Sequence, residues 1–582
     1  SAQSVSIVAA NESRTLTVAG GVGIGAVGVA GGVGVGVLAV RTEAFLGDSA
    51  RVRAQREFTL GALASADVTT FGLSVGAGVV GAAGAVSVWT VGTTPSATYS
   101  DGDSTANATQ TDNGNALGQA DTSGSGAGDG GYKGILTDAK ASTGTKADAH
   151  VNSGIASADA GVGGANPGGT GTQASFTSGS LPKGTVARIG QNAQVVTGTG
   201  DVAVRAGEQN EYLGVAGAAA IGAVGIGGAV VIANLVSNVD AGIATGASIT
   251  AGGGVLVSAT QTESTRGMGF AGAAGGVTLS GQIVLVDSNA IQNAHIDDGA
   301  AIPFAGGVVA ADAAATRRVE VIAAGGAIAA VAIGAAVGTA DAHGDTRARI
   351  GDVVIGSQAA SGGVRVTANS SITAPVTVIS VQGGILGGAM GAGATSLIRG
   401  ATAAEFDGRA TLFGGVQIAA TGRHEASTWT LGATSGLYTG GAIVSDADVT
   451  RTTTATLTAD TVIIAGGAVS VAADTRNTAR AESNGGVLGG AGFAFMTVSA
   501  DVTGGTTATA LGRILGSGSV SVSATGRNRA EAEALMVGVT ILGGGAGLTV
   551  SGTVAGSAGI VARLTSPQTI VSAGSVLVSA RE

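Results

Sequence analysis

The chain has 582 residues, and 106 of them are glycine, well above the usual share of about 7%. Hydrophobic residues make up 45% of the chain and charged residues only 11%, which excludes intrinsic disorder, while 6 prolines without a Gly-X-Y period exclude collagen. The net charge of -10 excludes nucleic acid as an expected partner, and the lack of cysteine excludes disulfides and thiolate-bound metals.

The first part of the chain contains a long run without charge. This run, Val18–Val40, has counterparts at Leu213–Val236 and Val321–Ala340. Each is long enough to cross a bilayer as a helix, and the small residues have a spacing that suits helix pairing, so a membrane-embedded glycine-zipper assembly is one alternative. Interior Gly costs a helix about 1 kcal/mol relative to Ala. We therefore expect stacked sheets, in which Gly lets neighbouring backbones approach closely.

A change of composition divides the chain into three predicted segments. Tyr99 and Ile189 belong to one series of similar residues, but they lie 90 residues apart where about 53 is expected. The intervening stretch is rich in Ser, Thr, Asn, Asp and Gly. We predict β-solenoid repeats over residues 1–99, an insertion over 100–186 and further repeats over 187–582. Such an insertion should project from one corner without interrupting the stack.

The insertion also holds the candidate metal ligands. Calcium prefers six to eight oxygen ligands from Asp, Asn and carbonyl groups on flexible turns. Asp101, Asp103, Asp112 and Asn113 supply such oxygens and are the candidate calcium ligands. The Gly-Gly-x-Gly-x-Asp nonapeptide of calcium-binding β-rolls is not repeated, so a solvated, partly disordered loop is the favoured interpretation and a calcium site is the alternative. No other cofactor is expected.

Two independent signatures return with a period of about 53 residues. The first valine of a Gly/Ser-x-Val-x-Val-x-Ala motif falls at Val202, Val255, Val308, Val364, Val416, Val469, Val520 and Val576. An Ile, Leu or Phe shortly after an Ala falls at Ile189, Ile243, Ile296, Ile350, Phe406, Leu457, Leu511 and Leu564. Because both series keep the same period, the chain is a repeat array.

Each repeat has three successive textures. A strand with closely spaced valines comes first, and a polar stretch such as Thr260–Arg266 follows. A Gly/Ala/Val run such as Val215–Ile232 comes last and should be buried on both sides. One repeat alone cannot bury that run, but stacking supplies a neighbour above and below. The pattern predicts an all-β fold, an elongated β-solenoid or β-helix.

The geometry of the stack can be predicted further. We expect about two rungs in each repeat, with one wide rung as the alternative. Two rungs of about 4.8 Å in each of some ten repeats give a rod of roughly 95 Å. Four of the repeated valines should point inward and stack in register: Val202, Val255, Val416 and Val520.

The order of these textures resembles a known family. The clearest stretch is Gly200–Ala259, in which Val230–Ala233 is followed by Ala241-Gly242-Ile243. It resembles the repeat arrays of leukotoxin-type filamentous adhesins of Gram-negative bacteria, and the resemblance covers nearly the whole chain outside the insertion. Here Ser, Thr and Ala mostly replace the Asn-rich turns of such arrays. Membership would imply an exported protein on the outer cell surface, acting in attachment or as a fibrous coat, and offers no catalytic motif.

Catalytic chemistry is poorly represented. His150, His295, His343 and His424 have no metal-ligand spacing and are expected in solvated loops, as is the polar cluster Asp341–Asp345. Solenoid enzymes that cut or epimerise polysaccharides group carboxylates with basic residues on one face. The acids are spread thinly in this sequence, so we expect no enzyme, and a polysaccharide-active enzyme is the alternative.

The predicted function is that of a structural or adhesive extracellular fibre on the bacterial cell surface. Expected partners are other copies of the chain, end to end or laterally, and a host or surface glycan or protein. A membrane is expected only through other parts of the full-length protein. Gly574–Ala580 reads as the opening strand of another repeat, so we expect the array to continue beyond the C-terminus or to dock end to end. Trp89 and Trp429 are expected to pack at rung edges.

Overall fold

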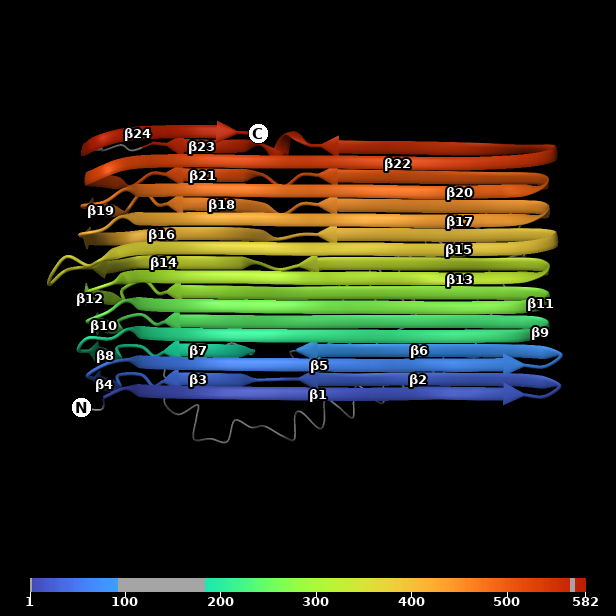
Figure 1. The fold of residues 1–582 in the computed structure, drawn as a ribbon, viewed down its shortest axis with the longest axis horizontal. Coiled ribbons are helices and arrows are strands. Elements are labelled where there is room, and N and C mark those ends of the chain that lie inside the picture. Colours follow the sequence, from blue (N-terminus) through green and yellow to red (C-terminus); the bar gives the residue numbers. More distant parts are fainter. Residues whose placement is uncertain (1–2, 93–183, 566–570) are drawn as a thin grey trace.

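The structure is a computed structural model that describes residues 3–92, 184–565 and 571–582. It confirms an all-β fold whose strands pair in parallel. Each repeat makes one turn, which we call a rung: an outgoing strand, a sharp bend, a return strand and a short closing strand (Figure 1). The strands follow the longest dimension of the molecule, and the rungs stack across it.

The strands follow the rungs in chain order. The first two rungs contain β1 (Val5–Ile24), β2 (Val27–Ala39), β3 (Thr42–Leu46), β4 (Arg51–Ala54), β5 (Phe58–Ala77), β6 (Val80–Gly92), β7 (Thr185–Ile189) and β8 (Gln194–Thr197). The next four contain β9 (Val202–Ile243), β10 (Ser248–Ala251), β11 (Val255–Ile296), β12 (Ala301–Ala305), β13 (Val308–His343), β14 (Thr346–Ile355), β15 (Gly363–Ile398) and β16 (Ala401–Leu412).

The remaining rungs continue the same order. They contain β17 (Val416–Val449), β18 (Thr452–Leu457), β19 (Val462–Ala465), β20 (Val469–Val502), β21 (Thr506–Ala510), β22 (Arg513–Val554), the short 3₁₀ helix η2 (Gly556–Ala558), β23 (Ile560–Leu564) and β24 (Val571–Arg581). The longest strands, such as β9 and β11, continue around the bend and form both long sides of a rung (Figure 1). The described part of the chain thus forms nine rungs and the start of a tenth.

The register confirms the repeat and corrects two of its members. The valine column is Val202, Val255, Val309, Val364, Val416, Val469 and Val520, each at most 2% exposed. Val309 replaces the predicted Val308, and Ala510 replaces Leu511 in the second series. In both cases adjacent residues of a strand point to opposite faces, so only one of them can enter the column.

The prediction of two rungs per repeat is wrong. Val255 pairs directly with Val202 on one side and with Val309 on the other, so strand neighbours are one whole repeat apart. Two rungs per repeat would place neighbours about half a repeat apart. Each repeat therefore adds only about 4.8 Å, and the described rungs rise roughly 45 Å instead of the predicted 95 Å.

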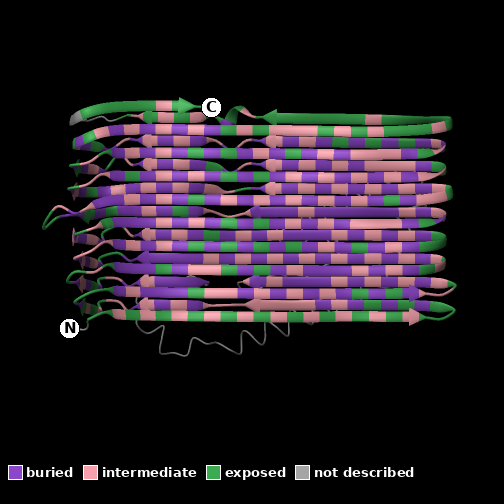
Figure 2. Ribbon diagram, in the orientation of Figure 1, coloured by how far each residue is buried: buried purple, intermediate pink, exposed green. Residues whose placement is uncertain are grey.

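One end of every rung is three-sided and encloses the first of two cores. Outgoing, return and closing strands each direct large side chains to a common centre, as Leu60, Ile189 and Val195 do in the second rung. These side chains are fully buried. We call this end the three-sided part; in Figure 2 it lies at the left, where buried residues are frequent in the strands between the first and the last.

The other end of every rung is a two-layered part that tapers toward the bend. The outgoing and return strands face each other directly and enclose a second core of mainly Ala and Val. Close to the bend the layers are too near for side chains: a Cβ atom on Gly23 or Gly76 would lie 2.2 Å from the carbonyl oxygen of Val29 or Ala82. The Gly/Ala/Val runs therefore form this taper, and only one face of each run is buried, contrary to prediction.

The uncharged runs are strands, so they do not form the helix pairs of a glycine zipper. Among the described residues, no helix has the length and apolarity needed to span a membrane. Trp89 is buried in the second core and its ring lies where a side chain on Gly36 would be, whereas Trp429 is half-buried. Trp89 is therefore a core residue and not a rung-edge residue.

The predicted insertion falls almost entirely outside the described residues. β6 ends at Gly92, and β7 begins at Thr185 in the same rung. The strand neighbour of Leu46 is Ile189. Tyr99, which was assigned to the same series, lies outside the described residues. β7 pairs with β3 on one side and with β9 on the other, so the stack continues across this junction.

Candidate functional site

Ionisable side chains gather where the three-sided part meets the two-layered part. On the outer face of the return strands, Asp287 pairs in register with Asp341, and Asp448 pairs with Asp501. Leu397 stands between these two pairs in the same column. Because register neighbours are about 4.8 Å apart, each pair brings two carboxylates together that lie more than fifty residues apart in the sequence.

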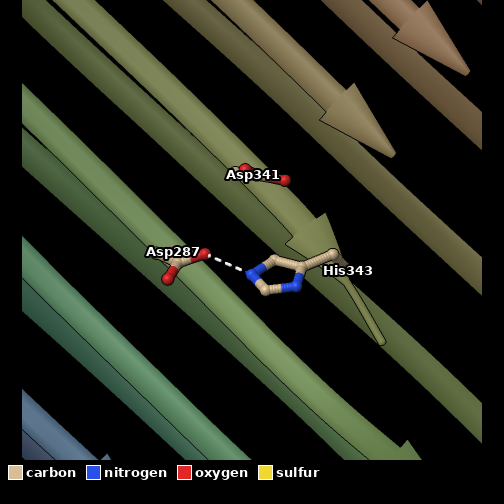
Figure 3. A group of neighbouring side chains, drawn as sticks. All are labelled: Asp287, Asp341 and His343. Carbon is tan, nitrogen blue, oxygen red and sulfur yellow. Dashed lines mark hydrogen bonds and ion pairs between the residues drawn. The ribbon is translucent and has the colours of Figure 1, made fainter. Parts of the chain in front are cut away.

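The first group combines both carboxylates with a histidine and an arginine. His343 Nε2 lies 2.8 Å from Asp287 Oδ1, and the Arg399 guanidinium pairs with both oxygens of Asp341 (Figure 3 draws the first contact). β11 supplies Asp287, and the end of β13 supplies Asp341 and His343. Burial raises the pKa of Asp341 even though Arg399 opposes this effect.

The second group is more acidic. Asp446, Asp448 and Asp501 each offer a carboxylate oxygen within 4.8 Å of the others. Ser499 Oγ donates to Asp446 at 2.6 Å, and Arg399 acts on Asp448 only electrostatically. Burial, followed by the charges of Asp446 and Asp501, raises the pKa of Asp448 to about 6. Negative charge therefore accumulates here at neutral pH.

A third group lies on the outer face of the three-sided part. His295 contacts Asp297 through Nδ1 at 2.6 Å and Asp240 through Nε2 at 3.2 Å. Burial alone would lower the pKa of His295, but the two carboxylates raise it to about 9. Arg188 adds an ion pair to Asp297 at 3.0 Å. The imidazole is thus charged at neutral pH, and with Arg188 the group joins three rungs.

A column of polar side chains crosses the interior between the two cores. All its members except Ile372 are polar, and they pair rung by rung: Asn210, Glu263, Arg317, Ile372, His424, Asn477 and Asn528. Arg317 Nε donates to Glu263 at 3.2 Å, and both side chains are almost wholly buried. Arg317 also donates to the carbonyl oxygen of His343 at 2.9 Å. The polar stretch Thr260–Arg266 therefore contributes to the interior.

His424, in this column, and the neighbouring Arg451 are both buried. His424 Nδ1 lies 2.7 Å from Asn477 Oδ1, and burial with the nearby Arg451 charge lowers the pKa of His424 to about 3. Arg451 donates to the carbonyl oxygens of Ala401 at 2.8 Å and Arg399 at 3.0 Å. Burial followed by the Arg317 charge lowers the pKa of Arg451 to about 9. These contacts connect neighbouring rungs and leave the groups little access to solvent.

The sequence-based site predictions have mixed outcomes. Asp101, Asp103, Asp112 and Asn113 lie outside the described residues, as does His150. The expectation of solvated loop histidines is wrong for the three others, because His295, His343 and His424 end or occupy strands, and His424 is buried.

The acidic groups were missed by sequence reasoning, although a signal for them exists. Asp287 and Asp341 are 54 residues apart, and Asp448 and Asp501 are 53 apart. A search for acids spaced by the repeat would have predicted both pairs. Acidic residues that are widely spaced in the sequence are therefore clustered in the structure.

These groups could support two kinds of chemistry. Three carboxylates, as in Asp446, Asp448 and Asp501, suit a hard cation such as Ca²⁺, whereas His343 with two carboxylates suits a transition metal. Asp287 and Asp341 already pair with His343 and Arg399, which weakens the second fit. Comparison with known proteins adds no assignment, since no family model, no curated protein and no solved structure matches the chain.

Proposed function

We propose that the chain is a structural or adhesive segment of an extracellular fibre on the bacterial cell surface. The observation that carries this proposal is the continuous register of the valine column from Val202 to Val520. Stacked rungs form a stiff body whose outer faces repeat every 4.8 Å or so, which suits display and attachment more than turnover of a small substrate. This architecture supports assignment to the β-solenoids, and the repeat textures support the leukotoxin-type adhesin family.

Stacking of additional rungs is part of the proposal. Val520 is 1% exposed because Val469 and Val576 pair with it in register on its two sides. Burying such side chains stabilises a stack by roughly 25 cal/mol per Å² of apolar surface. Further rungs that pair in the same way would lengthen the fibre.

The test is to display residues 1–582 on a non-adherent bacterium and to count cells retained on glycan-coated, protein-coated and uncoated surfaces. Adhesive function predicts higher retention for cells that display the chain. Val416→Asp, which disrupts the stack, should abolish the gain, and Phe413→Asn at an exposed corner should leave it unchanged. Equal retention of all cells, with globular particles of the purified chain in electron micrographs, would overturn the proposal.

A polysaccharide-active enzyme is the second candidate. It is supported by the outer-face group of Asp287, Asp341, His343 and Arg399, which unites acids and bases as glycan chemistry requires. Incubation with acidic polysaccharides should then give shortened or unsaturated products, and Asp287→Asn should stop their formation. Intact polysaccharide after incubation with the wild-type chain would exclude this candidate.

A further inference from the structure

The bends of the two-layered part carry exposed aliphatic side chains in rung after rung. They include Ile24, Ile221, Ile328, Ile385, Leu488 and Ile541, which are between 57% and 87% exposed. Turns usually combine Gly with Asn, Asp, Ser or Pro, because these residues suit the backbone and solvent. Here Gly is combined with Ile, Leu and Val. We call this row of side chains the tip ridge; it follows the right-hand bends in Figure 2.

No charged residue of the described part of the chain lies near the tip ridge. In the third, fifth and sixth rungs the uncharged stretches around the bend are residues 212–239, 321–340 and 366–398. Ten residues of strand span about 33 Å, so both layers are free of charge over most of the two-layered part. The charged groups of the same rungs lie at its border or in the three-sided part.

The alternation of side chains near the bend is the reverse of that in a water-exposed sheet. In β11, Thr278, Ser280 and Gln282 are buried between the layers, while Leu279 and Ile283 on the outer face are less buried. Gln282 Nε2 donates to the carbonyl oxygen of Ala271 across the interior at 3.1 Å. Small hydroxyl and amide groups of β11 therefore lie in the interior among Ala residues, and apolar groups cover its outer face.

A medium that surrounds the bend explains this distribution better than a single flat partner. A second copy would cover one face, but the bend and both faces are apolar. We propose that the tip ridge inserts into the interfacial layer of a lipid bilayer. Insertion by about 5–10 Å, as for other surface-bound elements, would immerse about two or three residues on each side of the bend.

The backbone at this depth is already paired from rung to rung. Gly78 N–H donates to the carbonyl oxygen of Ile221 at 3.0 Å, and Val224 N–H donates to that of Val79 at 3.1 Å. Unpaired backbone groups are costly in lipid, and here the inner rungs expose few of them. Shallow insertion along a ridge of about 40 Å therefore has a small polar cost.

The absence of charge near the bend determines the expected lipid dependence. Binding through apolar contact alone should be equal for neutral and anionic membranes and insensitive to salt, because screening acts on charges. This expectation does not depend on the proposed function. A fibre without adhesive activity and a polysaccharide-active enzyme could both carry such a ridge.

The test is flotation of residues 1–582 with vesicles of phosphatidylcholine alone and of phosphatidylcholine with phosphatidylserine, at low and high salt. The tip variant combines Ile221→Asn, Ile328→Asn and Ile385→Asn. Its matched control combines Val354→Asn, Phe413→Asn and Ile464→Asn, three exposed residues of the three-sided part. Circular dichroism and thermal unfolding verify that both variants fold.

The wild type and the control should float with both lipids at both salt concentrations. The tip variant should bind vesicles about tenfold less or weaker still, since three large apolar contacts are lost. Three outcomes would overturn the proposal: no flotation of the wild type, undiminished flotation of the folded tip variant, or binding only to anionic vesicles at low salt. Concentration-dependent self-association that only the tip variant loses would assign the ridge to a second copy instead.

Discussion

The three-sided part and the two-layered part fill their interiors with side chains of different size. Three strands around one centre leave a wide interior, where Phe58, Leu60 and Ile249 are fully buried. Two layers in direct contact leave less space, so mainly Ala and Val occupy the interior there, with Gly close to the bend. Side-chain size therefore determines where the chain forms the three-sided part and where the two layers pack directly against each other.

Substitution of a three-sided core residue should give the largest effect. Val416→Asp buries a carboxylate without a partner and should lower the free energy of unfolding by about 5 kcal/mol, or prevent folding. Val381→Asp on the exposed outer face of the two-layered part should cost less than about 1 kcal/mol. Denaturant unfolding of both variants measures the difference, and equal losses would contradict the assigned faces.

The polar column at the border of the two parts should come next. Arg317→Met leaves Glu263 charged and buried, so it should cost about 3–5 kcal/mol. Adding Glu263→Gln to Arg317→Met should recover part of the loss, because no buried charge then lacks a partner. Thermal and denaturant unfolding of the two variants measure the recovery. If the double variant is less stable than Arg317→Met, the ion pair is not the cause.

Substitution of a glycine in the taper, where the two layers are very close, should cause a smaller loss of stability. Gly76→Ala places a Cβ against the carbonyl oxygen of Ala82 and should cost about 2–3 kcal/mol. Gly84→Ala is the matched control in the same rung, since nothing lies within 4 Å of its new methyl group. Its effect should be within about 0.5 kcal/mol of zero. Similar unfolding midpoints for both variants would show that the layers are farther apart than described.

The charged group around His295 predicts a pH-dependent effect in the three-sided part. The pKa of His295 is raised to about 9 in the folded chain. The stabilisation that its protonated imidazole provides is therefore complete below the ordinary pKa near 6.5 and is lost as pH rises through 9. His295→Gln should therefore cost about 2 kcal/mol at pH 6 and much less at pH 10. Unfolding as a function of pH measures this, and a constant loss would rule out the titration.

The smallest effect should come from the acidic group beside the two-layered part. Asp448 has a pKa raised to about 6, so the folded chain binds its proton more tightly than the unfolded chain, and stability falls as pH rises from about 4 to 6. Asp448→Asn should raise stability by up to about 1 kcal/mol at pH 7–8 and leave it unchanged below pH 4. Asp287→Asn, which removes the partner of His343, should not stabilise. If Asp287→Asn raised stability as Asp448→Asn does, the expected difference between the two acidic groups would be wrong.

The candidate sites show where sequence reasoning stopped. The period of the repeat was readable, so the pairing of Asp448 with Asp501 could have been predicted from their spacing of 53 residues. The approach of Arg399 to Asp341 was not readable in this way, because it joins residues in different columns. The same holds for Arg317 and His343, whose contact crosses from an outgoing to a return strand.

The sequence by itself determined the all-β class, the period and the inward valine column. Valines of successive repeats can stack on one another only when they recur at a constant spacing along the chain. It could not determine the number of rungs per repeat, since spacing along the chain does not reveal where the chain bends. That was decided by the distance between the two layers, which Gly23 and Gly76 allow to become very small. The tip ridge and the buried polar column form only when the outgoing and return strands pack against each other, so only the tertiary structure shows them.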